Sequence, residues 1–312
     1  MYIKYLNILI LFLVLIGCRK DNPYKNLTTE YVIIVVIDGP RYSETWGDPN
    51  HTNIPYQSAL TSQGVLFTNF LNTGVTSTTP GHTSILTGVN QTIDNNGLEL
   101  PANPSLFQLW RKENSTAANK AWLICSKDKL AVLANCEDTD WNNQYMPSTN
   151  CGIGGLGLGT GYRDDSTTFA ATLTILSEDH PNLTLINFRE PDYSGHQANW
   201  NAYILGINQT DTYVAQLWEF IQNDPIYKNK TTLLITNDHG RHSPGVADEF
   251  VGHGDNCEGC QKLSLLALGP DFKGGRTVTK SYEQVDIAST VAYMLKFKLP
   301  KSEGEIMREL FE

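Results

Sequence analysis

Short, continuously apolar runs alternate along the chain with longer segments in which apolar residues recur at helical spacing. The apolar runs are residues 31–37, 65–70, 121–125, 183–188, 231–235 and 263–268. The helical segments between them are residues 54–62, 105–112, 167–176 and 203–221. Strands that are apolar on both sides are typical of a sheet covered on both faces. The alternation therefore predicts an α/β fold, with a largely parallel central sheet and helices on both faces.

Composition supports one sizeable domain. Of the 312 residues, 40% are hydrophobic, which is enough for a large core and excludes disorder for the chain as a whole. No linker or repeat divides residues 30–312, whereas residues 135–161 lack periodicity and are expected to form a small loop-rich insertion. The 33 acidic and 23 basic residues give a net charge of −10. Proteins that coat nucleic acid carry the opposite sign, so no nucleic-acid partner is expected.

The N-terminus has the features of an export signal. Lys4 precedes an apolar run at residues 8–16, which is too short for a membrane span of about 20 residues but fits the core of a signal peptide. The sequence Leu15-Ile16-Gly17-Cys18 resembles the bacterial lipobox. This resemblance predicts a lipoprotein signal peptide at 1–17, lipidation of Cys18 and a tether at 18–29. The protein would then be lipid-anchored to a bacterial membrane, on the periplasmic or cell-surface side. An uncleaved signal anchor is the alternative.

The remaining cysteines leave their pairing open. Cys136 with Cys151, and Cys257 with Cys260, could each close a local loop, whereas Cys125 ends an apolar run and is expected to be a buried thiol. The Cys257-x-x-Cys260 spacing also occurs in metal knuckles. Because the sequence shows no second such pair, a disulfide or two plain thiols is favoured.

Acidic and histidine residues follow three of the predicted strands. In open α/β sheets, ligands bind at the carboxyl ends of the strands. In this sequence, a loop before the last predicted strand adds a further histidine. Carboxylate oxygens and imidazole nitrogens together suit zinc or manganese, and six such ligands are enough for two ions. The six residues are Asp38, Asp192, His196, Asp238, His239 and His253.

A fourth strand end supplies a candidate nucleophile. In the segment after residues 65–70, Thr79 is predicted to cap a helix that begins at Pro80 and ends at Gly88. Thr78 would then lie just before a helix N-terminus, where free N–H groups favour a phosphate. An ordinary capped helix after a polar loop is the alternative.

Five ordered motifs carry a family resemblance. They are Ile37-Asp38-Gly39, T-x-P-x-H at 78–82, D-x-x-G-H at 192–196, Asp238-His239-Gly240 and His253-Gly254. Residues 284–290 also resemble the closing helix of the same family. Together these segments resemble the alkaline phosphatase superfamily, in particular its nucleotide pyrophosphatase/phosphodiesterase-like and threonine-dependent alkaline phosphatase branches.

The resemblance implies a role for each matching residue. One metal would be held by Asp192, His196 and His253. The other would be held by Asp38, Asp238 and His239, with the Thr78 oxygen as a further ligand. Zinc is the expected ion, and some relatives use manganese. Thr78 would attack phosphorus and form a covalent phosphothreonine. His82 matches a family position without being an expected ligand, and His242 is expected to be a plain surface residue.

Two lysines and two asparagines bear on the substrate. Lys127 and Lys129 resemble the Lys-x-Arg that contacts non-bridging phosphate oxygens in threonine-dependent alkaline phosphatases, with a solvated turn as the alternative. The family also places an asparagine on a phosphoryl oxygen, and Asn95 or Asn96 matches that position. Apolar contacts for the second substituent of a diester would come from Tyr193, Trp141 and Tyr145.

These observations predict a two-metal phosphoester hydrolase that acts on a small phosphorylated substrate and favours monoesters. The alternatives are a phosphodiesterase or nucleotide pyrophosphatase on the same site, and a catalytically inactive binding lipoprotein of the same fold. A sulfatase is disfavoured because the sequence has no C-x-P-x-R or S-x-P-x-R motif. The sequence leaves the oligomeric state open.

Overall fold

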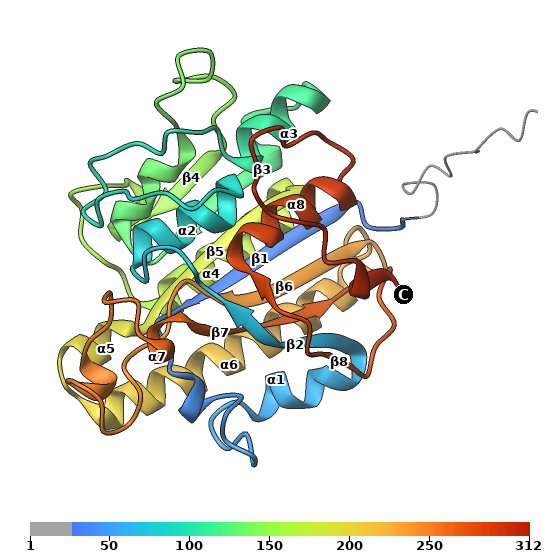
Figure 1. The fold of residues 1–312 in the computed structure, drawn as a ribbon. Coiled ribbons are helices and arrows are strands. Elements are labelled where there is room, and N and C mark those ends of the chain that lie inside the picture. Colours follow the sequence, from blue (N-terminus) through green and yellow to red (C-terminus); the bar gives the residue numbers. More distant parts are fainter. Residues whose placement is uncertain (1–26) are drawn as a thin grey trace, which may run out of the picture.

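The computed structural model describes residues 27–312, whose strands form a single mixed sheet (Figure 1). The strand order is β4-β3-β5-β1-β6-β7-β2-β8, with β9 beside β2. β7 runs antiparallel to its neighbours β6 and β2, and the other strand pairs are parallel. The largely parallel sheet predicted from the sequence is confirmed. The strands are β1 (Tyr31–Asp38), β2 (Gly64–Leu71), β3 (Ala121–Cys125), β4 (Ser148–Cys151), β5 (Leu183–Pro191), β6 (Thr231–Asn237), β7 (Lys262–Leu268), β8 (Arg276–Val278) and β9 (Tyr282–Glu283).

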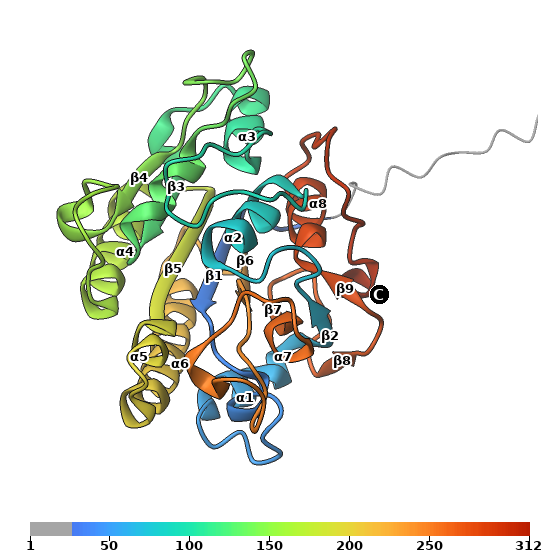
Figure 2. The same ribbon diagram turned by 60° about the vertical axis from the view of Figure 1, so that its left-hand side comes forward.

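Helices cover both faces of the sheet and create two hydrophobic cores (Figures 1 and 2). Val32, Ile34 and Val36 of β1 pack in the core with α2, α3 and α8, whereas Ile33 and Val35 pack on the opposite face with α1, α4 and α6. Because both sides of β1 are buried, its sequence is apolar from Val32 to Ile37. The helices are α1 (Pro55–Leu60), α2 (Thr78–Thr87), α3 (Leu106–Asn114), α4 (Asp165–Asp179), α5 (Asp192–His196), α6 (Trp200–Asn223), α7 (Glu258–Gln261) and α8 (Gln284–Met294).

The predicted insertion contains a strand that the sequence did not indicate. β4 lies within residues 135–161 and pairs in parallel with β3 at the edge of the sheet. Its sequence, Ser-Thr-Asn-Cys, is polar, and only Cys151 is buried. An edge strand with little burial has no apolar pattern by which it can be recognised.

Residues 27–312 contain no helix that is both long enough and apolar enough to cross a membrane. The predicted signal peptide, Cys18 and most of the tether lie outside the described residues. Within residues 27–312 the five cysteines carry free thiols, and Cys125 is fully buried, as expected from its place at the end of an apolar run.

Candidate active site at the carboxyl ends of the strands

The strand order places the predicted site residues at one edge of the sheet. β1 lies between β5 and β6, so Asp38 at the end of β1 meets the ends of both neighbours. Asp192 and His196 lie in α5, directly after β5, while Asp238 and His239 directly follow β6. Both views show α5 and α7 at the carboxyl end of β1 (Figures 1 and 2). His253 joins them from the segment between β6 and β7.

Asp38, Asp238 and His239 form the first group of candidate metal-binding side chains. Their ligand atoms lie within 4.8 Å of one another, and all three side chains are fully buried. Within the described chain, neither Asp238 Oδ2 nor His239 Nε2 has a hydrogen-bond partner. Buried polar atoms without partners are costly, and a shared cation would satisfy both of them. The donor set therefore fits a divalent metal ion.

Asp192, His239 and His253 form the second group, again with ligand atoms within 4.8 Å. His253 Nε2 lies 3.4 Å from Asp192 Oδ1, and the His239 and His253 rings stack with centroids 3.8 Å apart. His196 Nε2 lies 3.3 Å from the same Asp192 oxygen and 3.0 Å from His253 Nε2, at the half-exposed rim. The sequence assigned His239 to one metal only, whereas the structure places it between the two groups.

Backbone carbonyls orient the buried imidazoles. His239 Nδ1 donates to the Gly240 carbonyl at 2.9 Å, and His253 Nδ1 donates to the Thr76 carbonyl at 2.9 Å. In each ring the Nε2 lone pair is thereby turned toward the carboxylates, as metal-binding histidines require. Burial lowers the pKa of His239 to about 4, so the ring is neutral at neutral pH and able to bind a cation.

Lys127 joins the two groups to the candidate nucleophile. Its Nζ donates to Asp192 Oδ2 at 2.6 Å, to Asp38 Oδ1 at 2.8 Å and to Thr78 Oγ1 at 3.0 Å. Burial alone would raise the pKa of both aspartates, but the Lys127 ammonium holds each pKa below its usual value. Asp238 lacks such a bond, and burial together with the charge of Asp38 raises its pKa. The solvated turn considered for Lys127 is wrong, since the side chain is only 2% exposed.

Thr78 is the first residue of α2 rather than the residue before it. The predicted cap at Thr79 and start at Pro80 are wrong by two residues, because Ser77 is the N-cap. The first turn of a helix needs no intrahelical N–H partners, so Thr79 and Pro80 are both accommodated there. Gly88, with φ of 69°, ends the helix as predicted. The Thr78 hydroxyl consequently lies at the positive end of the helix dipole.

Asn95 and Lys129 lie beside this helix start. Asn95 Oδ1 accepts from the Thr79 backbone N–H at 2.9 Å and from Lys129 Nζ at 2.8 Å. Burial and the neighbouring Lys127 charge lower the pKa of Lys129 to about 8. Asn96 instead bonds Asp94 on the exposed loop, so its predicted place in the site is wrong. The sequence alone does not distinguish these two adjacent asparagines. In the structure the loop directs Asn95 toward the helix start and Asn96 toward Asp94.

A cleft of about 170 Å³ opens over these groups. Tyr193 lines the cleft as predicted, and Tyr162 is a lining residue that the sequence did not indicate. The predicted contribution of Trp141 and Tyr145 is wrong: both lie near Lys112 of α3, whose Nζ is 4.4 Å from the centroid of the Trp141 ring. The lining residues are Thr78, Asn95, Lys127, Lys129, Tyr162, Asp192, Tyr193, His196, Gln197 and His253.

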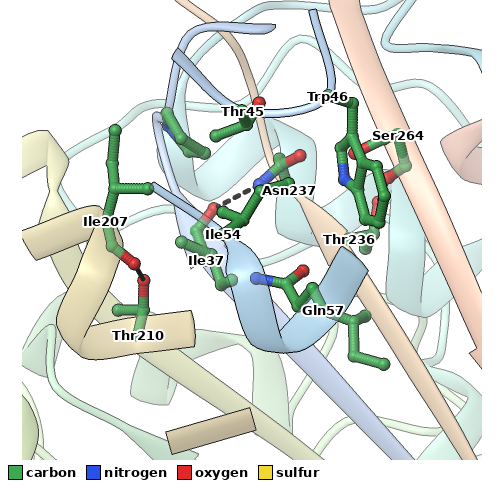
Figure 3. Close-up of a pocket in the computed structure, with 12 residues that line it drawn as sticks. Ile37, Thr45, Trp46, Ile54, Gln57, Ile207, Thr210, Thr236, Asn237 and Ser264 are labelled. Carbon is green, nitrogen blue, oxygen red and sulfur yellow. Dashed lines mark hydrogen bonds between the residues drawn. The ribbon is translucent and has the colours of Figure 1, made fainter. Parts of the chain in front are cut away.

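A separate cavity on the α1 and α6 face of β1 and β6 has room for about one water molecule (Figure 3). Ile37, Ile207 and Gln57 are among its lining residues, and it contains none of the predicted site residues. The cleft at the strand ends is therefore the place where a substrate can reach the candidate metal ligands.

Two glycines and an arginine allow the close packing of the site. At Gly39, with φ of 60°, a Cβ would lie 2.9 Å from both Asp192 Oδ1 and His239 Cε1. At Gly81 a Cβ would lie 2.4 Å from the Asp238 carbonyl oxygen, so glycine lets α2 approach the end of β6. Arg241, fully buried, donates to the Gly39 and Asp192 carbonyls at 3.0 and 2.8 Å. No sequence pattern pointed to this arginine.

Solved structures share the fold at low sequence identity. A phosphonate monoester hydrolase from Silicibacter pomeroyi matches with a TM-score of 0.67 and 15% identity, covering 91% of this chain and 76% of that one. Murine ectonucleotide pyrophosphatase/phosphodiesterase 5 matches with a TM-score of 0.62 and 17% identity, covering 90% of this chain and 100% of that one. The alkaline phosphatase PafA matches with a TM-score of 0.65 and 12% identity, covering 91% of this chain and 99% of that one. The chain thus shares the fold of these hydrolases, including the alkaline phosphatase PafA, as the sequence motifs predicted.

The sequence profile described as type I phosphodiesterase/nucleotide pyrophosphatase matches residues 32–244. The chain belongs to this family of metal-dependent phosphoric ester hydrolases. A 2,3-bisphosphoglycerate-independent phosphoglycerate mutase from Haloquadratum walsbyi is 28% identical over 123 residues, which cover 38% of this chain and 22% of the mutase. The match thus spans less than a quarter of the length of that relative.

Proposed function

We propose that this protein hydrolyses small phosphate esters through a covalent phosphothreonine at Thr78, with monoesters favoured. One observation carries the proposal: the Thr78 hydroxyl shares Lys127 with Asp38 and Asp192, one carboxylate from each metal-binding group. The candidate nucleophile therefore lies where the two groups meet. An ammonium that donates to a hydroxyl oxygen stabilises the alkoxide form of that hydroxyl, and the N-terminus of α2 acts in the same direction.

The residues present would hold two divalent ions, with zinc expected and manganese as the alternative. Asp192, His196 and His253 would bind one ion, and Asp38, Asp238 and His239 would bind the other together with the Thr78 oxygen. Bound there, such ions supply Lewis-acid stabilisation of the entering and leaving oxygens.

The chain's own groups then account for the bond changes. Thr78 Oγ forms a bond to phosphorus as the bond to the leaving oxygen breaks. Water next attacks the phosphothreonine, releasing phosphate and restoring the hydroxyl. Asn95, fixed by the Thr79 N–H and by Lys129, presents its amide at the edge of the cleft, where it can orient a phosphoryl oxygen.

Charge at the cleft supports a preference for monoesters. A monoester dianion carries one more negative charge on its non-bridging oxygens than a diester does. Two lysines line the cleft, and both are buried, where charges interact more strongly than in water. Relative to a diester, a monoester therefore gains more from Lys127 and Lys129.

Replacement of Thr78 tests the nucleophile. Thr78→Ala should reduce turnover of p-nitrophenyl phosphate by about three orders of magnitude or more while metal content and the unfolding temperature change little. Thr78→Ser, which keeps a hydroxyl, is the matched control and should retain much more activity. Near-wild-type turnover by Thr78→Ala would overturn the proposal.

A phosphodiesterase or nucleotide pyrophosphatase is the second candidate, because the matching family carries that description. The Tyr162 and Tyr193 side chains line the cleft and offer apolar contact to a second substituent. Lys127→Ala and Lys129→Ala separate the two candidates, since each should reduce kcat/KM for p-nitrophenyl phosphate more than for its bis-ester. Equal losses, or a wild-type preference for the bis-ester, would favour the diesterase. Failure to hydrolyse either ester with metal supplied would favour an inactive binding lipoprotein.

We also propose a lipid anchor at Cys18, based on the lipobox-like sequence Leu15-Ile16-Gly17-Cys18. Such an anchor would hold the domain at a bacterial membrane, on the periplasmic or cell-surface side. The polar residues that follow Cys18 would separate the catalytic domain from the membrane surface.

A further inference from the structure

A third cluster of metal-binding side chains lies in the segment that returns the chain from β6 to β7. It consists of His242, Asp255, Cys257 and Cys260, whose ligand atoms all lie within 4.8 Å of one another. It shares no residue with the two groups at the strand ends. The expectation that His242 is a plain surface residue is wrong, because its side chain is only 9% exposed. The sequence shows no second pair of ligands for Cys257-x-x-Cys260. The segment between β6 and β7 folds back and brings His242 and Asp255 to these cysteines.

The separations within the cluster are close to those around a shared ion. Zinc bonds of about 2.0–2.3 Å place neighbouring ligand atoms roughly 3–4 Å apart in a tetrahedral site. Cys257 Sγ and Cys260 Sγ are 3.1 Å apart, and Cys260 Sγ is 3.5 Å from Asp255 Oδ1. His242 Nε2 is 3.2 Å from Asp255 Oδ2. Four donors of three chemical types therefore lie close enough for a single ion, which would require the two sulfur atoms to move about 0.7 Å further apart.

His242 is oriented as a ligand. Its Nδ1 contacts Asp248 Oδ1, and a carboxylate that accepts this hydrogen leaves the Nε2 lone pair pointing at the cluster. Nε2 is buried and has no hydrogen-bond partner in the part of the chain that the structure describes. The lone pair and the Asp255 carboxylate would repel each other at this separation, and a cation between them removes that repulsion. The pairing of His242 with Asp248 is common around protein-bound zinc, where a carboxylate accepts a hydrogen bond from the ring nitrogen that does not bind the metal.

We infer that His242, Asp255, Cys257 and Cys260 form a third metal site, separate from the catalytic groups. Two thiolates with an imidazole and a carboxylate select an ion of the zinc class in tetrahedral geometry. With all four positions taken by protein, the site is structural rather than catalytic.

The site fastens the segment that carries His253. The Gly240 N–H donates to the Cys260 carbonyl at 2.7 Å, and the His242 N–H donates to the Gly252 carbonyl at 3.2 Å, so the two ends of the segment are already paired. His253 stands two residues before Asp255. An ion at the third site would therefore hold His253 against Asp192 without contacting the substrate.

Cobalt substitution tests the inference on the full chain, independently of the hydrolase activity. Thiolate-bound Co(II) gives an intense near-ultraviolet charge-transfer band, and the two groups at the strand ends contain no cysteine. The reduced wild-type protein loaded with cobalt should show this band. Cys257→Ser and Cys260→Ser should each reduce it, and the double variant should lose it. Cys136→Ser, which changes a buried thiol outside the cluster, is the matched control and should keep the band.

Metal content gives the second measurement. By elemental analysis the wild type should retain one more zinc per chain than the Cys257→Ser/Cys260→Ser variant, and His242→Ala should retain that ion more weakly. A missing band in the reduced wild type would overturn the inference, as would a band unchanged in the double variant. A Cys257–Cys260 disulfide in freshly purified protein, detected by alkylation without reductant and mass spectrometry, would also overturn it.

Discussion

Removing the Lys127 charge tests the electrostatics of the site. In the metal-free protein this ammonium is the only cationic side chain bonded to Asp38 among the described residues, and it also pairs with Asp192. Lys127→Met keeps most of the side-chain volume while leaving those carboxylates without this charge. Breaking a buried ion pair from one side costs about 3–5 kcal/mol. For a domain of this size we expect the unfolding temperature to fall by about 6–20 °C.

Metal should reverse this loss. Divalent ions bound at the same carboxylates would supply the missing positive charge, so the deficit of Lys127→Met should shrink when zinc is added. The assay is thermal unfolding of chelator-treated wild type and variant, with and without added zinc. Lys230→Met is the control, because Lys230 makes an exposed ion pair with Glu30 and should change stability by less than about 1 kcal/mol.

Two outcomes would refute this reasoning. Equal unfolding temperatures for metal-free Lys127→Met and wild type would show that Lys127 does not stabilise the buried carboxylates. A deficit that zinc leaves unchanged would show that the ions do not bind at Asp38 and Asp192. The first outcome would contradict the ion pairs of the structure, and the second would contradict the proposed metal site.

Three further predictions address pH, packing and anchoring. Burial lowers the pKa of His82 to about 4 from an ordinary 6.5, so the native state binds fewer protons than the unfolded state between these values. The contribution of His82 to the free energy of unfolding is complete above pH 6.5, and about 3 kcal/mol of it is lost as the pH falls to 4. Urea unfolding of the metal-free protein should therefore depend less on pH in His82→Asn than in the wild type. Identical pH profiles for the two proteins would contradict this. Gly81→Ala places a Cβ against the Asp238 carbonyl and should cost about 1–3 kcal/mol and lower kcat, whereas an unchanged unfolding temperature would refute the close approach. Cys18→Ser should move the protein from the membrane fraction to a soluble or unprocessed form; equal solubility of the two proteins would show that the lipobox was misread.

The strand ends could be predicted from the sequence because burial on both faces gives β1, β5 and β6 apolar runs that stop near the carboxyl end of each strand. Asp38 follows its run directly, and Asp238 follows its run after Thr236 and Asn237. Adjacent parallel strands bring such residues to one edge of the sheet. The start of α2 was harder to predict. Thr78, Thr79 and Pro80 all suit a first turn, so the helix boundary depends on contacts that local propensity does not contain.

The remaining parts of the site depend on long-range packing. Lys127 follows β3, and Asp38 ends β1. Lys127 reaches both carboxylates only because β3 lies beside β5, so that β5 is the one strand between β3 and β1. Arg241 and His242 become buried because the segment after β6 folds back closely. At Gly259 a Cβ would lie 2.4 Å from the Arg241 carbonyl oxygen. Residue types and spacing along the chain do not reveal such a reversal.

The stereochemical course at phosphorus tests the central proposal most directly. Attack by Thr78 followed by attack of a second nucleophile comprises two in-line displacements, each of which inverts phosphorus. The measurement uses a monoester that is chiral at phosphorus through oxygen isotopes, with transfer to an added alcohol so that the product remains chiral. Net retention of configuration is the predicted result. Net inversion would mean that the acceptor attacks the substrate directly and would contradict a phosphothreonine intermediate.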